Sequence, residues 1–212
     1  YLGTSCIYPK FAKNPISENS LLTGELEKTN QCYAIAKIAG IKLSEALFRD
    51  YKLDIICLMP TNVYGNNDNF DKVNGHVIPA IITKIIEAKN RSKKNVKLLG
   101  TGAPIREFIN SKDLAEAIFT CLSVSQKRIK KIFKNNLPII NIGTGENIKI
   151  RNLANMIANF SKYKGTINFD KKSPDGTYKK NLNSKIIKSL GWKPKIKLKH
   201  GLKEVIYSKF SK

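Results

Sequence analysis

Apolar residues follow two patterns along this chain, and the two patterns alternate. Continuous apolar runs such as DIICLMP (54–60) and PIINIG (138–143) are typical of strands buried on both faces of a parallel sheet. Elsewhere apolar residues recur every three or four positions, which predicts helices over about 31–51, 76–89, 112–122 and 150–163. Strand–helix–strand alternation of this kind indicates an α/β fold with a mostly parallel sheet.

Shorter segments complete this expected pattern. Residues 1–7 resemble a buried strand, and NVKLLG and PIREFIN resemble two short strands. Ser111 is a suitable N-cap for the helix that follows it. Two short helices are expected on either side of Gly191-Trp192. The basic run QKRIKKIFK (126–134) is expected to be a solvated loop.

The charge of the chain is strongly positive. There are 38 Lys and Arg residues against 16 Asp and Glu residues, which gives a formal net charge of +22. Such a balance can indicate a nucleic-acid-binding protein, but the sequence contains no motif of that class. We therefore expect no nucleic-acid partner, although a basic cleft would also suit a small molecule that carries phosphate.

The cysteines and the apolar runs bear on the location of the protein. None of the four cysteines belongs to a C-x-x-C pair or a zinc spacing, so we expect no metal site and a reducing, cytoplasmic environment. No apolar run approaches the roughly 20 residues that a membrane span needs, so we expect no membrane partner. The chain opens directly on an apparent strand at Tyr1, which suggests that it is a fragment.

The segment QCYAIAKIAG (31–40) contains a candidate catalytic pair. Tyr33 and Lys37 are four residues apart, so on a helix they share one face. An ammonium group beside a phenol stabilises the phenolate, and such a tyrosine can exchange a proton with a carbonyl oxygen while a hydride moves to the carbon. The spacing alone has little specificity, because an exposed Tyr–Lys pair occurs by chance in many helices.

Polar residues at two predicted strand ends support the catalytic interpretation. Thr4 and Ser5 lie towards the end of the first strand, and TNVYG follows the run that ends at Pro60. Ligands of open α/β sheets bind at the carboxyl ends of the strands. A Ser or Thr hydroxyl, a tyrosine and a lysine gathered there could surround one substrate oxygen.

These stretches, in order, make the chain resemble the extended short-chain dehydrogenase/reductase superfamily and, within it, the family of GDP-L-fucose synthases. The matching segments are SCIYPK, YAIAKIAG, MPTNVYG, DNF, HVIPA, REF, NIGTG and KSPDGTYKKNLN. The resemblance implies an NADP(H)-dependent enzyme that epimerises a GDP-4-keto-6-deoxy sugar at two carbons and then reduces its ketone. It also implies a GDP-sugar partner and a homodimer.

The resemblance also implies a role for individual residues. Cys6 and His76 would be the acid and base of epimerisation; a buried apolar cysteine and a helix-capping or surface histidine are the alternatives. Tyr33 would donate a proton to the C4 oxygen, which Thr4 would hold. Residues assigned to the cofactor are Leu2, Gly3, Thr4, Ser5, Lys37, Pro60, Thr61, Asn62, Val63 and His76. Residues assigned to the substrate are Lys84, Leu99, Arg106, Asp175 and Lys180, for which ordinary surface, turn or ion-pair roles are the alternatives.

The sequence departs from the family pattern in several places. Leu99 stands where some members carry an aromatic residue, Tyr178-Lys179 replaces Pro-Arg, and Asn183 replaces Asp. No G-x-x-G-x-x-G or G-x-G-x-x-G occurs, so the first half of the dinucleotide fold is expected in a longer gene product or a second chain. Without that half, the chain alone is expected to bind NADP poorly and to be inactive.

The expected architecture is therefore a partial Rossmann fold, doubly wound with a mostly parallel sheet, and an interleaved smaller substrate domain. Residues 1–62 and 111–145 are assigned to the NADP-binding remnant, and residues 63–110 and 146–212 to the substrate domain. Two alternatives remain open: another nucleotide-sugar epimerase or dehydratase of the superfamily, or a non-catalytic basic binding protein on the same fold.

Overall fold

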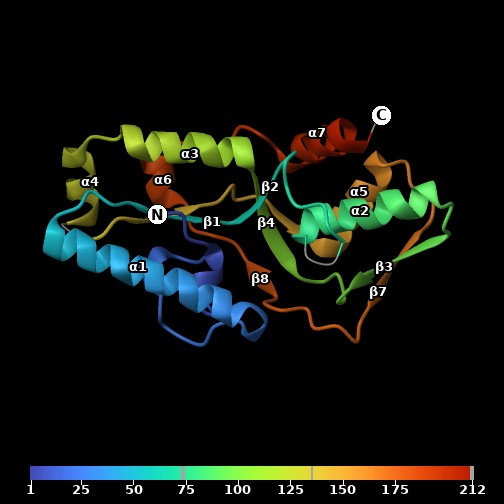
Figure 1. Cartoon of the computed structure of the whole chain (residues 1–212), viewed down its shortest axis with the longest axis horizontal. Coiled ribbons are helices and arrows are strands. Elements are labelled where there is room, and N and C mark those ends of the chain that lie inside the picture. Colours follow the sequence, from blue (N-terminus) through green and yellow to red (C-terminus); the bar gives the residue numbers. More distant parts are fainter. Residues whose placement is uncertain (73–74, 135, 211–212) are drawn as a thin grey trace. The chain divides into compact units, whose positions relative to one another are not determined.

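The computed structural model describes residues 1–72, 75–134 and 136–210, which form two compact units (Figure 1). Unit 1 consists of Tyr1–Val63, Glu107–Gly145 and Lys180–Lys195, and unit 2 consists of Tyr64–Arg106, Glu146–Lys179 and Ile196–Lys212. The segment 180–195, which the sequence analysis assigned to the substrate domain, packs with unit 1.

The centre of unit 1 is a pair of buried parallel strands. Strand β1 (Cys57–Pro60) pairs with β5 (Ile139–Ile142), with Cys57 opposite Ile139. On the other edge of β1, Leu2 forms a single parallel bridge with Leu58. All residues of β1 are buried, as expected for a strand covered on both faces.

The strand expected over residues 1–7 is wrong beyond its first residues. Residues Ser5–Ile7 form a 3₁₀ turn, η1, because the Thr4 hydroxyl accepts a hydrogen bond from the Cys6 backbone N–H at 3.2 Å. A Ser or Thr side chain that caps a nearby N–H in this way competes with the strand ladder. Cys6 therefore does not lie on a strand face shared with Thr4.

Helix α1 (Gln31–Tyr51) has the predicted bounds. It buries a stripe at helical spacing and ends where Lys52 adopts a left-handed conformation with φ of 57°. Helix α3 (Ser111–Ser123) begins one residue earlier than expected. Its N-cap is Asn110, whose side-chain oxygen accepts from the N–H of Lys112 at 3.0 Å, so Ser111 is the first helical residue.

The basic run 126–134 is not the expected loop. Residues Gln126–Phe133 form helix α4, in which Ile129 is buried while most of the basic side chains are exposed. Its two partly buried neighbours, Ile132 and Phe133, pack against the unit 1 core. Apolar residues at i, i+3 and i+4 outweigh the charge of the run, because the lysines remain in water. Helix α6 (Lys185–Ser189) completes unit 1.

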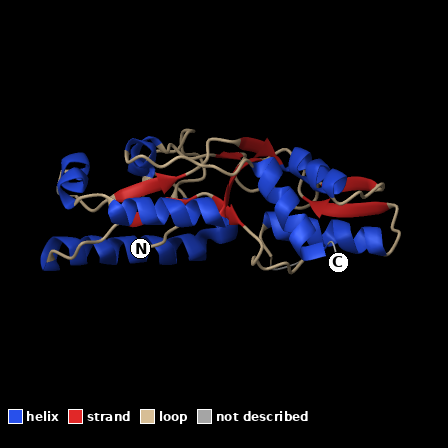
Figure 2. Ribbon diagram, turned by 90° about the horizontal axis from the view of Figure 1, so that it is seen from above, coloured by secondary structure: helices blue, strands red, loops and turns tan. Residues whose placement is uncertain are grey.

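Unit 2 surrounds a second parallel pair of strands, β3 (Asn95–Leu99) and β7 (Thr166–Asp170). Helix α2 (Val77–Asn90) packs on β3 and on α5 (Ile150–Phe160), and α5 also packs on α7 (Leu198–Phe210) (Figures 1 and 2). Alternate residues of β3 are exposed and buried, so one face of this pair is solvated.

A third sheet has the strand order β2 (Asn62–Tyr64), β4 (Ile105–Asn110), β6 (Asn147–Lys149), and β8 (Lys179–Lys180) also pairs with β4. Two further 3₁₀ turns, η2 and η3, span Glu18–Ser20 and Lys28–Asn30. Among the helices of the described residues, none combines the length and the apolar character that crossing a membrane requires.

A buried carboxylate, Glu107, joins several segments of unit 1. Its two side-chain oxygens accept hydrogen bonds from the backbone N–H groups of Gly145, at 2.5 Å, and Leu182, at 2.9 Å. Its backbone carbonyl accepts from the side chains of Thr61 and Asn62, each at 2.9 Å. Burial raises the pKa of Glu107, and the two N–H groups offset part of that cost by stabilising the charged form.

We predict that Glu107→Gln lowers the stability of the protein. The amide has only one acceptor oxygen, so one of the two backbone N–H groups loses its partner at a cost of about 1–3 kcal/mol. The matched control is Glu116→Gln, which removes an exposed ion pair with Lys195 in the same unit and should cost under about 1 kcal/mol. Urea midpoints measure both, and equal midpoints would contradict the role of Glu107.

Candidate active site

The candidate catalytic pair lies on one face of α1, as the spacing predicts. The Lys37 ammonium is 5.9 Å from the centre of the Tyr33 ring. Tyr33 is 49% exposed, so its phenol is open to a ligand. The pair therefore has both proximity and access, which proton exchange with a bound molecule requires.

Lys37 connects this pair to the first strand segment. Its ammonium donates to the carbonyl of Leu2 at 3.0 Å and lies 5.4 Å from the centre of the Tyr1 ring. Helix α1 also packs against η1, which contains Ser5. The structure thus brings Lys37 to the segment Leu2–Ser5, where the sequence analysis placed one side of the cofactor site.

The second predicted cofactor segment, Pro60–Val63, follows β1 directly. The N–H of Thr61 donates to Ile142 at 3.0 Å, and the Thr61 hydroxyl donates to Glu107. Thr61 is buried, whereas Asn62 and Val63 are half-buried. Earlier on the same strand, the Leu58 carbonyl accepts a hydrogen bond from the N–H of Gly3 at 2.9 Å, which links the two predicted cofactor segments.

Cys6 lies in a small polar cluster. The side-chain N–H of Asn30 is 3.3 Å from the sulfur, and the ammonium of Lys180 is 3.9 Å from it. Lys180 is buried, with 7% exposure. The sequence analysis assigned Lys180 to the substrate and did not identify Asn30. The one available signal for Asn30 was its place as a polar residue immediately before α1. Its side-chain oxygen is buried and has no hydrogen-bond partner among the described residues.

His76 belongs to unit 2 and precedes α2 at the N-cap position. Its side chain is 83% exposed and makes no capping hydrogen bond. Its Nδ1 lies 3.6 Å from a carboxylate oxygen of Asp68. The other histidine, His200, is exposed on α7.

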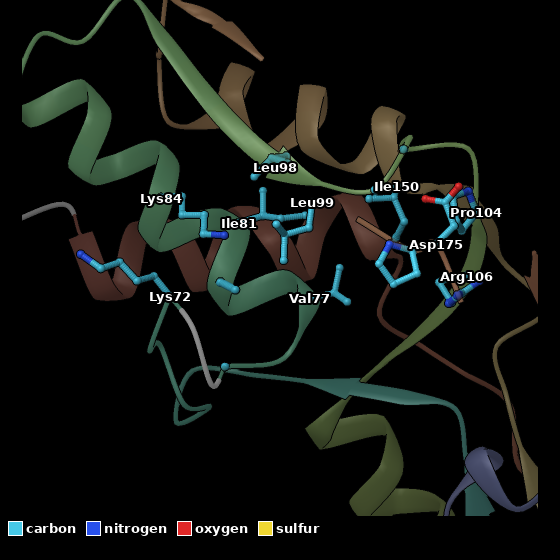
Figure 3. Close-up of a pocket in the computed structure, with 15 residues that line it drawn as sticks. Lys72, Val77, Ile81, Lys84, Leu98, Leu99, Pro104, Arg106, Ile150 and Asp175 are labelled. Carbon is cyan, nitrogen blue, oxygen red and sulfur yellow. The ribbon is translucent and has the colours of Figure 1, made fainter. Parts of the chain in front are cut away.

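A pocket of about 260 Å³ in unit 2 gathers four of the predicted substrate residues. These are Lys84 from α2, Leu99 at the end of β3, Arg106 from β4 and Asp175 from the loop after β7. Figure 3 shows Lys72 and Lys84 towards one end of the pocket and Arg106 and Asp175 towards the other, with apolar side chains between them. We call this the unit 2 pocket.

The chemistry of the unit 2 pocket suits an anion with an apolar or aromatic part. Its lining holds three basic side chains, Lys72, Lys84 and Arg106, and one acidic side chain, Asp175. Lys72 is also paired with Glu87 at 3.2 Å. Leu99 is 68% exposed at its edge. Sequence reasoning did not identify Lys72, Pro174 or Ile150 as lining residues, because they come from three separate segments with no shared motif.

Comparison with known proteins decides the family. The model of the NAD dependent epimerase/dehydratase family matches residues 1–143. The chain belongs to the NAD dependent epimerase/dehydratase family. The match includes the Tyr33–Lys37 pair, Cys6, His76 and Arg106, so most of the predicted site residues lie inside the part that the family model covers.

Individual curated proteins are also similar to this chain. Probable GDP-L-fucose synthase 1 of Oryza sativa subsp. japonica is 44% identical over 204 residues, which are 96% of this chain and 60% of that protein. GDP-L-fucose synthase of Escherichia coli (strain K12) is 45% identical over 95% of this chain and 63% of its own length. The chain thus spans about 60% of the length of these curated relatives.

A solved structure also agrees closely in fold with this chain. The crystal structure of a GDP-6-OMe-4-keto-L-xylo-heptose reductase from C. jejuni has a TM-score of 0.90 and 34% identity. The similarity covers 99% of this chain and 69% of that one. Together with the parallel strand pairs, it confirms the expected mixed α/β, Rossmann-like fold class.

We predict that the cysteines differ sharply in reactivity. Burial raises the pKa of the Cys121 thiol to about 11, whereas Cys32 is exposed. Alkylation requires the thiolate, and at pH 8 only about one Cys121 in a thousand would be ionised. Iodoacetamide at pH 8 should therefore modify Cys32 and leave Cys121 intact, as measured by peptide mass spectrometry. Modification of all four in urea is the control, and equal rates in the native protein would contradict the burial of Cys121.

Proposed function

We propose that this chain is the larger part of an NADP-dependent GDP-sugar epimerase–reductase that converts GDP-4-dehydro-6-deoxy-D-mannose to GDP-L-fucose. The observation that carries the proposal is the contact of Lys37 with both Tyr33 and the Leu2 carbonyl, in a chain 44–45% identical to GDP-L-fucose synthases. That contact joins a proton donor to the strand end where ligands of such sheets bind.

The reduction step needs a proton at the C4 oxygen. Tyr33 donates this proton in the proposal, and the Lys37 ammonium lies 5.9 Å from the centre of its ring. The Thr4 hydroxyl, which accepts from the Cys6 N–H, still has a proton to donate to the same oxygen. NADPH, when bound, supplies the hydride to C4. Lys37, Leu2–Ser5 and Pro60–Val63 would hold this cofactor, because their backbone groups border the strand ends.

The epimerisation step needs a base and an acid beside the ketone. Protons on the two carbons next to a polarised carbonyl are acidic, so each inversion removes a proton from one face and returns one to the other. Cys6 and His76 take these two roles in the proposal. Asn30 and Lys180 orient the sulfur of Cys6, and Asp68 orients the imidazole of His76.

The unit 2 pocket binds the GDP part of the substrate in this proposal. Arg106 can grip a phosphate with two N–H groups, while Lys84 and Lys72 add point charges. The apolar side chains between the two charged ends, including Leu99 and Ile150, suit a base or a ribose. The assignment of residues 1–62 and 111–145 to the cofactor, and of 63–110 and 146–212 to the substrate, remains part of the proposal.

The proposal also includes the part of the protein beyond these 212 residues, the oligomeric state and the location. We propose that tight NADPH binding needs the part of the relatives' length that these 212 residues do not span, because a pyrophosphate is held by a glycine-rich turn at a helix N-terminus. A homodimer and a cytoplasmic location, inferred from the resemblance and from the cysteine pattern, belong to the same proposal.

A second candidate is reduction of a different GDP-keto-sugar. The C. jejuni protein of similar fold is described as a heptose reductase, and the same Tyr–Lys chemistry would serve any such ketone. Turnover of GDP-4-keto-heptose but not of the deoxymannose would favour this candidate. A non-catalytic basic protein would instead show salt-sensitive binding to mixed nucleic acid and no turnover.

We predict that the 212-residue chain alone binds NADPH weakly, with a dissociation constant above the micromolar range. Isothermal titration calorimetry measures this directly. A longer protein that contains the chain together with a glycine-rich turn is the control and should bind at least about 100-fold more tightly, since each tenfold gain corresponds to about 1.4 kcal/mol. Micromolar binding by the 212 residues alone would refute the requirement.

We predict that Tyr33→Phe lowers ketone reduction by about 10²–10⁴-fold, because the proton donor is lost. The test uses an active preparation, either the 212-residue chain or a longer protein that contains it, and follows NADPH absorbance. Exchange of deuterium from solvent into the keto-sugar should continue, because Cys6 and His76 remain. The matched control is Tyr51→Phe on the same helix, where the ring is 73% exposed. An unchanged rate for Tyr33→Phe would sink the proposed function.

A further inference from the structure

The turn Gly100–Gly102, which follows β3, is held by a carboxylate from a distant segment. Asp175 accepts from the backbone N–H of Thr101 at 2.7 Å through one oxygen. It accepts from the Thr101 hydroxyl at 2.5 Å through its other oxygen. These two residues are 74 positions apart, so the pair ties the loop after β7 to the turn after β3. Charge-assisted bonds of this two-point kind are the strong class of protein hydrogen bonds.

Other contacts fix the same turn. The Thr101 carbonyl accepts from a guanidinium N–H of Arg151 at 2.9 Å, and the Thr101 hydroxyl accepts from the N–H of Ala103 at 3.1 Å. Gly100 and Gly102 both have positive φ, 79° and 73°. A side chain on Gly100 would collide with a carboxylate oxygen of Asp175, so the turn is shaped to admit this carboxylate.

The position of Thr101 relative to the unit 2 pocket separates two possible roles of Asp175. Gly100, Gly102, Pro174 and Asp175 line the pocket, but Thr101 does not. Both oxygens of Asp175 already accept hydrogen bonds from Thr101. A carboxylate repels a diphosphate unless donors offset its charge. These donors come from the protein itself, which suits a carboxylate that shapes the pocket wall.

We propose that Asp175 is a positioning residue for the nucleotide-binding wall of the unit 2 pocket and that it acts through Thr101. This inference rests on the proposed function, since it takes a nucleoside diphosphate as the ligand. Asp175 holds the turn Gly100–Gly102 and the loop that carries Pro174 in the geometry that the ligand meets. Thr101, which no resemblance assigned, then determines affinity without touching the ligand.

The competing role is direct contact with the base. A carboxylate can accept hydrogen bonds from the N1–H and the 2-amino group of guanine. Loss of such a contact would change the preference for GDP over IDP, because IDP lacks the 2-amino group. Loss of a positioning contact would lower the affinity for both nucleotides by the same factor. The ratio of the two affinities therefore distinguishes the roles.

The test is calorimetric titration of the 212-residue chain with GDP and with IDP. Thr101→Val keeps the shape of the side chain and removes the hydroxyl that donates to Asp175. We expect this substitution to lower the affinity for both nucleotides about tenfold, which is the effect of losing one hydrogen bond to a charged group. Thr101→Ser should restore wild-type affinity. Asp175→Asn should weaken the binding of both nucleotides and leave the ratio of the GDP and IDP affinities unchanged. The double variant Thr101→Val/Asp175→Asn should bind them no more weakly than Asp175→Asn alone.

The controls separate a local effect from a loss of folding. Thr166→Val makes the same substitution in the same unit, at a hydroxyl that donates to the Lys94 carbonyl outside this pocket, and should leave nucleotide affinity unchanged. Melting temperatures of all variants check the fold, and Thr101→Ser keeps the test valid if Thr101→Val melts early.

Each result has a distinct meaning. Wild-type affinity in Thr101→Val, together with a changed GDP-to-IDP ratio in Asp175→Asn, would overturn the positioning role and leave the proposed function intact. Absence of binding of either nucleotide to the wild-type chain would overturn the proposed function and, with it, the inference about Asp175.

Discussion

The carboxylate of Glu107 is the interaction on which the geometry of unit 1 depends. It is fully buried, and it connects the segment after β5, the segment around Leu182 and, through the backbone carbonyl of Glu107, the residues that follow β1. A buried charge is costly unless donors surround it, so the surrounding backbone must keep this arrangement. Gly143 leaves the room for it, because a side chain there would collide with the carboxylate.

The polar cluster of Cys6 shows how a local change of structure alters a candidate catalytic group. Had residues 1–7 continued as a strand, Cys6 would have faced the same side as Thr4. The 3₁₀ turn instead directs the sulfur towards Asn30 and the buried ammonium of Lys180. The capping hydrogen bond from the Cys6 N–H to Thr4 therefore decides which groups surround the thiol.

Most of the basic side chains lie on the solvated surface, and only a few line the unit 2 pocket. Most of the net charge of +22 lies on solvated lysines, as on the exposed face of α4. The unit 2 pocket uses only three basic side chains and places them at its two ends. A diffuse positive surface raises the rate at which an anion arrives, and in the proposed function the few basic side chains of the pocket determine where the anion binds. Asp175 is the one carboxylate among the described residues that line the pocket, and the hydrogen bonds that both of its oxygens accept from Thr101 offset part of its negative charge.

The sequence by itself determined the features that depend on local spacing. The helical period places Tyr33 and Lys37 on one face of α1, because i and i+4 neighbours meet wherever a helix forms. The extent of the same apolar period predicts both ends of that helix. The apolar runs likewise identified β1 and β5. Only the tertiary structure decided which distant groups meet: Lys180 and Cys6 are 174 positions apart, and Asp175 and Thr101 are 74 apart. It also turned residues 126–133 into a helix, because the burial of Ile129 and the packing of Ile132 and Phe133 against the unit 1 core outweigh a basic composition. Such contacts depend on how several segments pack together, and no spacing within one segment encodes them.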